Sequence, residues 1–549
     1  MFVRVKSTPN SPRKSIQIVE NIRIGNTTKQ KILHYVGIAK DEIMEEQLKN
    51  LAHETIKRLE KERQTQTELF DEIAPKIRGR KPKKDIADII PTNEVLLSDI
   101  EEEKRIVEGV DEIAGAAYNE IGYDKLLTRG SNQLLKDVVL ARLIFPYSKH
   151  KLCKVLFEQF DKKYDLNKLY RLMDQIHPNI NKIKQITCVK TQALMPNADV
   201  VLFDVTTLHF ESIEADEFRE FGYSKNFRFN TTQVVLALAT NEHGLPIGYE
   251  LFQGNKAEVK TLIESINKWR ELFNINNVTF VGDRAMFSKD NLALMDEHGY
   301  KYVIAAKLRG LSKQLQDQIL DEKNYQLDFY EKEVSWIGEF NLDGEHNGRR
   351  LISTYAPSRA RHDRTHRNQI LESLQPKTGA ASKLIKNGAK KYIKVEAGTT
   401  TIDEAKIARD EQWDGMHGII TNIHDQHAKE LLTKYRSLWH IEEAFRINKH
   451  DLKMRPIYHW TQKRIESHVA LCYMSFALLK YIQYKVEVTQ IKFSVQDVLE
   501  VLMKVQASIH VHKKTGDRYR LPSSMSNNAR CIYKSFEIER SLDASIYLP

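Results

Sequence analysis

Apolar and polar positions alternate in short runs over the first 38 residues, for example in Phe2–Val5 and Ser15–Val19. Gly25-Asn26 marks a turn between two such runs, so this segment is predicted to form a small antiparallel β unit. Residues 40–70 are rich in Glu, Lys, Leu and Gln and contain no Pro or Gly, which predicts a charged helix.

The apolar spacing changes near residue 198. Residues 100–190 show helical spacing, as in Leu134, Leu135, Val138 and Val139, whereas later apolar runs are short and continuous. Three strands joined by short turns, and then strands alternating with helices at 257–272 and 288–297, predict an α/β fold with a mixed sheet covered by helices. The predicted strands are 200–203, 232–239, 246–252, 278–281 and 302–306.

The rest of the chain completes a division into seven segments. Residues 310–415 contain turns, strand-like pieces and many basic residues, and long helices are predicted at 425–448 and 461–483. A further helix near 494–505 precedes a hairpin around 513–516. The segments are a β unit with its helix (1–72), a basic linker (73–99), a helical region (100–195), the first part of an α/β core (196–309), a β-rich insertion (310–425), two core helices (426–485) and a C-terminal region (486–549).

Charge points to a polyanionic partner. The 549 residues include 84 Lys and Arg against 74 Asp and Glu, a net charge of +10, and nucleic acid is the commonest polyanion that such a surplus suits. Four scattered cysteines without CxxC spacing argue against a disulfide framework and a cysteine zinc site. The longest apolar run, Val469–Leu479, is too short to span a membrane, and the N-terminus lacks an apolar signal region, so a cytoplasmic protein is expected.

Two aspartates follow apolar strands, and one glutamate lies on a predicted helix. Asp204 ends the first strand, Asp283 ends the fourth, and Glu442 lies within 425–448. Carboxylates at strand ends of an α/β sheet stand at the edge where sites form, and three of them suit Mg²⁺ or Mn²⁺. A single aspartate at a strand end is more often a turn former or a helix cap.

The helix around Glu442 carries a second pattern. Tyr435, Glu442 and Lys449 are spaced by seven residues each, which returns a helix to nearly the same face. A phenol, a metal-ligating carboxylate and a phosphate-binding ammonium would thus form one stripe, while Glu443 is turned away. The alternative is a solvated helix whose Leu438, Ile441 and Phe445 form an ordinary core stripe.

These motifs resemble those of a bacterial insertion-sequence DDE transposase of the insertion-sequence-four type, in its sixteen-thirty-four branch. Asp204, Asp283 and Glu442 match the acidic triad, and Tyr435 and Lys449 match the Tyr-Arg-Glu-Lys signature, in which Leu438 replaces the Arg. Other similar stretches are Gly222–Lys225, Phe252–Glu258, Asp283–Ser288 and Trp413–Gly415. The resemblance covers about residues 130–480.

The resemblance implies a ribonuclease H-like catalytic core with a β-rich insertion, preceded by a mostly helical region that binds DNA ends. It implies two Mg²⁺ or Mn²⁺ ions held by the triad, water attack at the element ends, and strand transfer by the released 3′-hydroxyls. The implied partners are double-stranded DNA (terminal inverted repeats and target) and a second copy of the chain, on the bacterial nucleoid. DNA contacts are expected from Tyr435, Lys449, Arg284, Arg436, Arg446, Arg78 and Arg80.

Several assignments stay open at the sequence level. Arg78-Gly79-Arg80 resembles an AT-hook that enters a narrow minor groove, or it is a flexible basic linker. The basic residues of the insertion, including Arg349, Arg350, Arg359 and Arg367, form either a second DNA surface or a solvated face. Trp413 either stacks on an unpaired base or packs in the sheet.

Two other functions remain as alternatives. One is a transposase-derived DNA-binding protein without catalysis. Leu438 is compatible with it, because this residue replaces the Arg of the signature. The other is a metal-dependent nuclease of the same fold, against which the long basic N-terminal region argues, because a nuclease core needs no end-recognition domain.

Overall fold

The computed structural model describes residues 2–7, 14–24, 27–39, 41–71, 95–196, 199–211, 215–221, 231–257, 260–273, 278–283, 288–330, 333–342, 348–372, 390–396, 399–489 and 492–548. The chain forms two compact units, Met1–Glu94 and Val95–Pro549.

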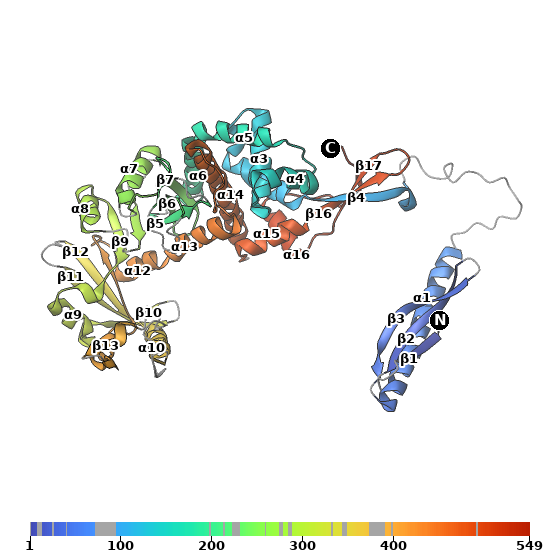
Figure 1. Cartoon of the computed structure of the whole chain (residues 1–549), viewed down its shortest axis with the longest axis horizontal. Coiled ribbons are helices and arrows are strands. Elements are labelled where there is room, and N and C mark those ends of the chain that lie inside the picture. The colour runs from blue at the N-terminus through green and yellow to red at the C-terminus, as the bar shows by residue number, and fades with distance from the viewer. Residues whose placement is uncertain are drawn as a thin grey trace, which may run out of the picture. The chain divides into compact units, whose positions relative to one another are not determined.

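The first unit is a three-stranded antiparallel sheet with one helix against it (Figure 1). Strands β1 (Phe2–Ser7), β2 (Lys14–Ile24) and β3 (Thr27–Ala39) pair in chain order, and α1 spans Glu42–Asp71. Ile16 and Ile18 pack against Ala52 and Ile56 of the helix because alternate strand residues face the same side. The strands and the helix predicted from the sequence are therefore confirmed.

The second unit is built on a nine-stranded mixed sheet with the order β10-β11-β12-β15-β9-β8-β5-β6-β7. Its strands β5, β8 and β9 are parallel neighbours, and the other pairs are antiparallel. All five strands predicted from apolar runs are present, which confirms the mixed sheet. The strands are β5 (Val200–His209), β6 (Gln233–Thr240), β7 (Pro246–Gln253), β8 (Thr279–Gly282), β9 (Lys301–Ala305), β10 (Gln326–Tyr330), β11 (Glu333–Leu342), β12 (Arg349–Tyr355) and β15 (Met416–Thr421).

Four strands of the predicted insertion, β10, β11, β12 and β15, extend this same sheet beyond β9. The insertion also contains the hairpin β13 (Ile393–Glu396) and β14 (Thr399–Ile402). Its helices are α9 (Lys313–Leu320), α10 (Pro357–Glu372) and α11 (Glu404–Glu411). The arginine-rich stretch that begins at Ser358 is therefore helical.

The two faces of the sheet bury different residues because strand side chains alternate. On one face, Val201 and Phe203 pack with Trp269 of α7 (Thr261–Phe273) and Met295 of α8 (Lys289–Glu297). On the other face, Leu202 joins a larger core around α14 (Gln462–Val488). That helix is apolar around most of its circumference, as a helix enclosed by others must be.

Helices from both ends of the second unit surround α14 (Figure 1). They are α2 (Gly115–Ile121), α3 (Arg129–Ile144), α4 (Lys149–Phe160), α5 (Leu166–Ile176) and α6 (Ile180–Leu194), with α15 (Val495–Lys504) and α16 (Asn527–Ser535). The helical segments predicted near 494–505 and at 461–483 are confirmed. Residues of the predicted regions 100–195 and 486–549 thus share one hydrophobic core.

The prediction of helix from residue 100 onward was wrong at its start. Ile100–Val107 forms strand β4, which pairs with β16 (Gln506–His512) in a four-stranded sheet with β17 (Arg518–Pro522) and β18 (Ser545–Ile546). Glu and Lys favour helix locally, but pairing with a strand from the far end of the chain overrides that preference. Within the described ranges, none of the helices is long and apolar enough to cross a membrane.

Candidate active site

Asp204 and Asp283 lie at the same level of neighbouring parallel strands. Phe203 of β5 is paired with Gly282 of β8, and each aspartate is the next residue along the chain. The expectation that Asp204 ends its strand was wrong, because pairing with β6 continues β5 to His209, whereas β8 ends at Gly282. Asp204 is half-buried, and its Oδ1 accepts a hydrogen bond from the Val205 amide at 2.7 Å, whereas Asp283 is exposed. The register therefore brings the two predicted carboxylates side by side.

Both aspartates belong to the sheet face that carries α14. Leu202 and Val281, two residues before each aspartate, lie in the core on that face together with Ile441 of the helix bearing Glu442. Because residues two apart on a strand share a face, Asp204 and Asp283 are directed to the same side as that helix.

The helix predicted at 425–448 is interrupted. The structure has α12 (Ala428–Arg436), α13 (Trp439–Arg446) and then a π-helical turn, Ile447–Asp451. At the interruption the Leu438 amide donates to the Tyr435 carbonyl (3.1 Å) and the His440 amide to the Ser437 carbonyl (2.9 Å). These three-residue bonds tighten the chain without reversing it, so Tyr435 and Glu442 still face the same groove.

Charge effects on Tyr435 and a hydrogen bond of Lys449 show that the predicted stripe lies near the two aspartates. Burial raises the pKa of Tyr435, and the nearby carboxylates Asp283 and Glu442 raise it further, while Arg359 opposes them. Lys449 donates a hydrogen bond to the Thr206 hydroxyl, two residues beyond Asp204 on the same strand face. The residues of the stripe therefore lie over the end of the sheet that carries both aspartates.

A groove of about 260 Å³ lies beside Glu442 and contains residues from three separate parts of the chain. Tyr435, Leu438 and Glu442 line it from the two helices, His417 from β15, and Arg359 from α10. Arg359 is one of the basic residues expected at a DNA surface, but no local pattern places it near Glu442, because only the tertiary fold brings α10 to this helix.

His417 is the partly buried neighbour of Tyr435, with the ring centroids 5.1 Å apart. Burial lowers the pKa of His417 to about 4, and the charges of Arg359 and Arg436 lower it further in the same direction. The imidazole is therefore neutral at physiological pH, and the positive charge of the groove comes from the two guanidinium groups.

The other predicted DNA-contact residues differ in position. Arg436 is exposed and lines the groove. Arg446 is instead paired with Asp451 (3.2 Å) and Glu443 (3.7 Å). Arg284, Arg78 and Arg80 lie outside the described residues.

Comparison with known protein families shows which family the chain belongs to. Residues 196–478 match the family described as "Transposase DDE domain", which is more than half of the chain. The chain belongs to this transposase family. A search of solved structures found the cryo-EM structure of a piggyBac transposase synaptic complex with hairpin DNA, with 10% identity, 72% of this chain and 77% of that chain covered, and a TM-score of 0.36. No curated protein matches.

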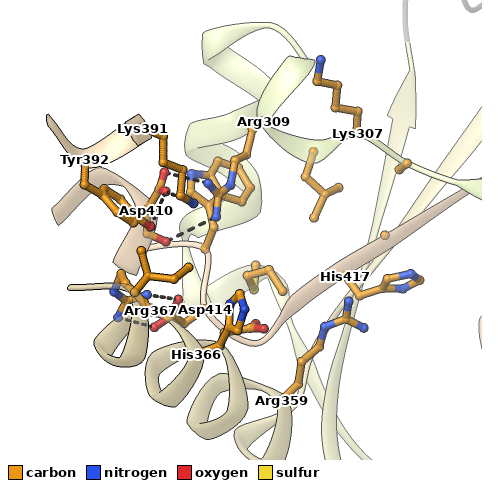
Figure 2. A pocket seen from close by; sticks show the side chains of 17 residues that line it. Lys307, Arg309, Arg359, His366, Arg367, Lys391, Tyr392, Asp410, Asp414 and His417 are labelled. Carbon is orange, nitrogen blue, oxygen red and sulfur yellow. Dashed lines mark hydrogen bonds and ion pairs between the residues drawn. The ribbon is translucent and has the colours of Figure 1, made fainter. Parts of the chain in front are cut away.

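A second pocket of the transposase, about 430 Å³, adjoins the groove and shares Arg359 and His417 with it. Figure 2 shows Arg359 beside His417, away from a polar cluster around Asp410. Asp410 accepts from Arg309 (2.7 Å), Lys391 (3.2 Å) and the Tyr392 hydroxyl (2.9 Å). Asp410 therefore pairs with two of the pocket's cations, Arg309 and Lys391, and offsets one of their two charges.

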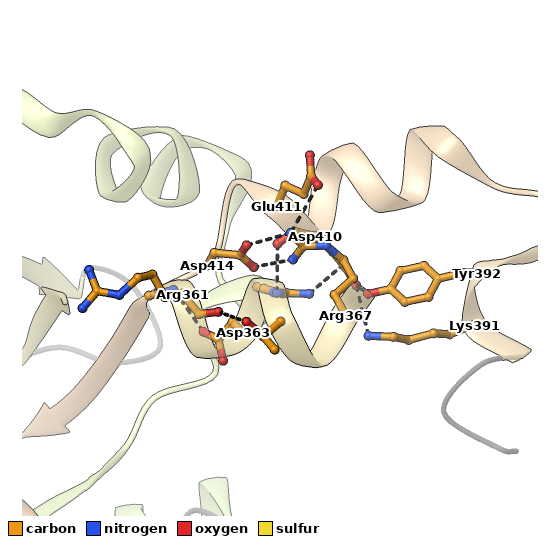
Figure 3. A network of polar contacts seen from close by, with 11 residues as sticks. Arg361, Asp363, Arg367, Lys391, Tyr392, Asp410, Glu411 and Asp414 are labelled. Carbon is orange, nitrogen blue, oxygen red and sulfur yellow. Dashed lines mark hydrogen bonds and ion pairs between the residues drawn. The ribbon is translucent and has the colours of Figure 1, made fainter. Parts of the chain in front are cut away.

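Several basic residues of the insertion are structural. Arg367 pairs with Asp414 at 2.5 Å and 2.8 Å (Figure 3), Arg349 with Asp296, and Arg350 with Glu339. Arg349 and Arg367 are buried, so the expectation that all three belong to a DNA-binding or solvated face was wrong for these two. Trp413 is also buried, in the core beside β12, which confirms packing.

The donor chemistry of Asp204, Asp283 and Glu442 fits a hard divalent cation, since all their ligand atoms are carboxylate oxygens. In the part of the chain that the structure describes, no three His, Cys, Asp or Glu side chains are gathered closely enough to hold a metal ion as they stand. Glu442 is exposed on α13, where rotation of its side chain changes the position of its carboxylate freely.

Proposed function

We propose that this transposase binds the terminal inverted repeats of an insertion sequence, cleaves the element ends and joins the 3′-hydroxyls to target DNA. The subfamily we propose is the insertion-sequence-four type, in its sixteen-thirty-four branch. One observation carries the proposal: Asp204, within β5, and Asp283, directly after β8, lie at the same level of adjacent parallel strands, on the face covered by the helix of Glu442.

Asp204, Asp283 and Glu442 would hold two divalent ions, Mg²⁺ or Mn²⁺. Bound ions of this kind activate water and neutralise charge on the reacting phosphate. The remaining side chains position the DNA: Lys449, held against Thr206, offers an ammonium to a backbone phosphate beside the scissile one.

Arg359 supplies the cation that Leu438 lacks. Leu438 is partly buried against the core and lines the same groove as Arg359 and Glu442. A guanidinium from α10 can bind a phosphate oxygen at this place with two parallel hydrogen bonds. The departure from the signature is therefore compensated from another element, which favours an active enzyme over a DNA-binding protein without catalysis.

The DNA partner and the assembly belong to the same proposal. Double-stranded element ends and target DNA are the substrates, and two copies of the chain act together on the two ends. The basic surplus of the chain supports a DNA partner.

The test is an assay with purified full-length protein and a linear DNA that carries the flanks of its gene. With Mg²⁺, cuts at the element ends and joined products are expected, and Asp204→Asn should bind the ends but not cut them. Specific binding without Mg²⁺-dependent cuts would support the DNA-binding alternative. Cuts that ignore the terminal sequence would support the nuclease alternative.

A further inference from the structure

A pocket of about 570 Å³ in the helical part of the second unit is lined by basic side chains without acidic ones. It lies where the end of α3, the start of α4, α5 and α14 meet the segment after the π-helical turn. Its basic residues are Arg142, Lys149, His150, Lys453, Arg455, His459 and His468, and among its described lining residues there is no aspartate or glutamate. We refer to it as the cationic pocket.

Two of these cations are buried without a carboxylate partner. Arg142 is 2% exposed; its Nη2 donates to the Leu452 and Lys453 carbonyls (2.8 and 3.0 Å), while its Nε lacks a hydrogen-bond partner. Lys149 is 5% exposed, and its Nζ lies 3.3 Å from His468 Nδ1, with no ion pair recorded within the described residues. Buried charges of one sign are costly unless an opposite charge joins them.

Two histidines of the pocket, His459 and His468, are neutral at physiological pH. Burial lowers the pKa of His459 to about 3 and holds that of His468 well below its usual value, with the neighbouring cations Lys149 and Arg142 acting in the same direction. Burial also lowers the pKa of Lys149 to about 7. Near pH 7 Lys149 is therefore only partly protonated, and an anion bound beside it would stabilise its charged form.

Helix α4 adds a second, independent preference for an anion. Its N-cap Ser148 accepts from the Lys151 amide at 3.4 Å, and Ser148, Lys149 and His150 at the start of this 12-residue helix all line the pocket. The first amides of a helix point outward without partners in the helix and favour negative charge, which is the usual arrangement around a bound phosphate.

The pocket is also linked to the candidate active site. Lys453 follows Lys449 by four residues, and the Ile457 amide approaches the carbonyl of His209, at the end of the strand that carries Asp204, at 3.5 Å. A strand of DNA held at Lys449 can thus continue along the same segment toward Lys453.

We propose that the cationic pocket binds a phosphate group, and that this phosphate belongs to the DNA backbone beyond the one held at Lys449. The DNA source rests on the proposed function, whereas phosphate binding itself does not. Free phosphate is the other source of the same chemistry.

The test uses the full-length protein with two probes, inorganic phosphate and a duplex oligonucleotide. The variants are Lys149→Gln and Lys453→Asn; asparagine suits position 453 because its backbone φ is +44°. The matched control is Lys154→Gln, an exposed lysine of the same helix outside the pocket, paired with Glu158 at 3.5 Å. Far-UV circular dichroism establishes that each variant folds.

For DNA, each pocket variant should lower the slope of log affinity against log salt by about 1, while the control keeps the wild-type slope. For free phosphate, the melting temperature of the wild type should rise above that in chloride of equal ionic strength, and the pocket variants should lose this rise. Loss of the phosphate effect with unchanged DNA slopes assigns the pocket to free phosphate and overturns the DNA source.

The proposal would be overturned if the pocket variants had the same salt slope for DNA, and the same rise in melting temperature with phosphate, as Lys154→Gln. Failure of the proposed function is a separate result: wild-type protein that never cuts element ends, but whose pocket variants still change the salt slope, contradicts the proposed chemistry and leaves phosphate binding in place.

Discussion

The position of Arg359 beside Glu442 is a feature that local sequence patterns do not reveal. Asp204 and Asp283 could be found from the sequence because each comes at the end of a run of apolar residues, and Glu442 because of its spacing from Tyr435 and Lys449. Arg359 has no such local pattern, and it reaches the groove only because α10 packs next to β15. Contacts between distant segments are not encoded in short-range spacing.

We therefore predict that Arg359→Gln slows DNA cleavage by about 10-fold or more, since a hydrogen bond between charged groups contributes roughly 1.5–3 kcal/mol and 1.4 kcal/mol corresponds to tenfold. Single-turnover cleavage of an end-containing duplex measures this rate. Arg361→Gln is the control, because Arg361 is an exposed arginine of the same helix that points away from the polar network (Figure 3). Equal rates for the two variants would remove Arg359 from the site.

At the scale of elements, the Trp413-Asp414-Gly415 motif fixes the turn before β15. Gly415 has φ +80°, and a Cβ there would lie 2.8 Å from the Ala356 carbonyl oxygen, so a larger residue is excluded. Asp414 pairs with the buried Arg367 of α10, and the Gly415 amide donates to Asp363 of the same helix at 3.0 Å. The motif thus attaches α10, with Arg359, to the sheet.

Asp414→Ala is expected to lower the free energy of unfolding by roughly 2 to 3 kcal/mol, because the buried Arg367 guanidinium then loses the carboxylate with which it forms its closest ion pair. Urea denaturation measures the change. The control is Glu411→Ala, since Glu411 is about half exposed and its contact with Arg367 is a single one at 3.2 Å, which predicts less than about 1 kcal/mol. A loss at Asp414 no larger than at Glu411 would contradict this role.

The packing and pairing of whole elements explain which of them could be predicted from the sequence. The apolar runs of β5, β6, β7, β8 and β9 predict strands because both faces of the sheet are buried. Strand β4 was not predictable, because its partner β16 lies near the other end of the chain. The interruption at Ser437 and Leu438 was also missed, since it contains no Pro or Gly to mark it.

At the scale of the whole molecule, partly buried histidines make the fold sensitive to acid. The pKa of His417 is lowered to about 4, mainly by burial, and burial also lowers that of His440, to about 4, and that of His459, to about 3. Each folded pKa lies below the unfolded value of about 6.5, so the unfolded chain binds the proton first. Stability is therefore present above pH 6.5 and falls as the pH decreases toward 4.

For His417 alone, linkage predicts a loss of about 2 kcal/mol of unfolding free energy between pH 7 and pH 5. Denaturant melts of the wild type and of His417→Gln at both pH values measure it, and the variant should lose less stability on acidification by about that amount. His366→Gln, at an exposed histidine of α10, should keep the wild-type difference. A His417 variant with an unchanged pH dependence would be inconsistent with a neutral, partly buried imidazole.

The central claim is that Glu442 completes a catalytic set with Asp204 and Asp283, and its neighbour provides a matched control. Glu443 has the same side chain but pairs with the buried Lys480 at 3.3 Å and with Arg446, so its role is structural. The most direct measurement compares Mg²⁺-dependent cleavage of element ends by Glu442→Gln and Glu443→Gln. The expected result is a loss of more than about 10²-fold for Glu442→Gln with DNA binding retained, and a rate within about fivefold of wild type for folded Glu443→Gln. Cleavage by Glu442→Gln at the rate of Glu443→Gln would contradict the assignment.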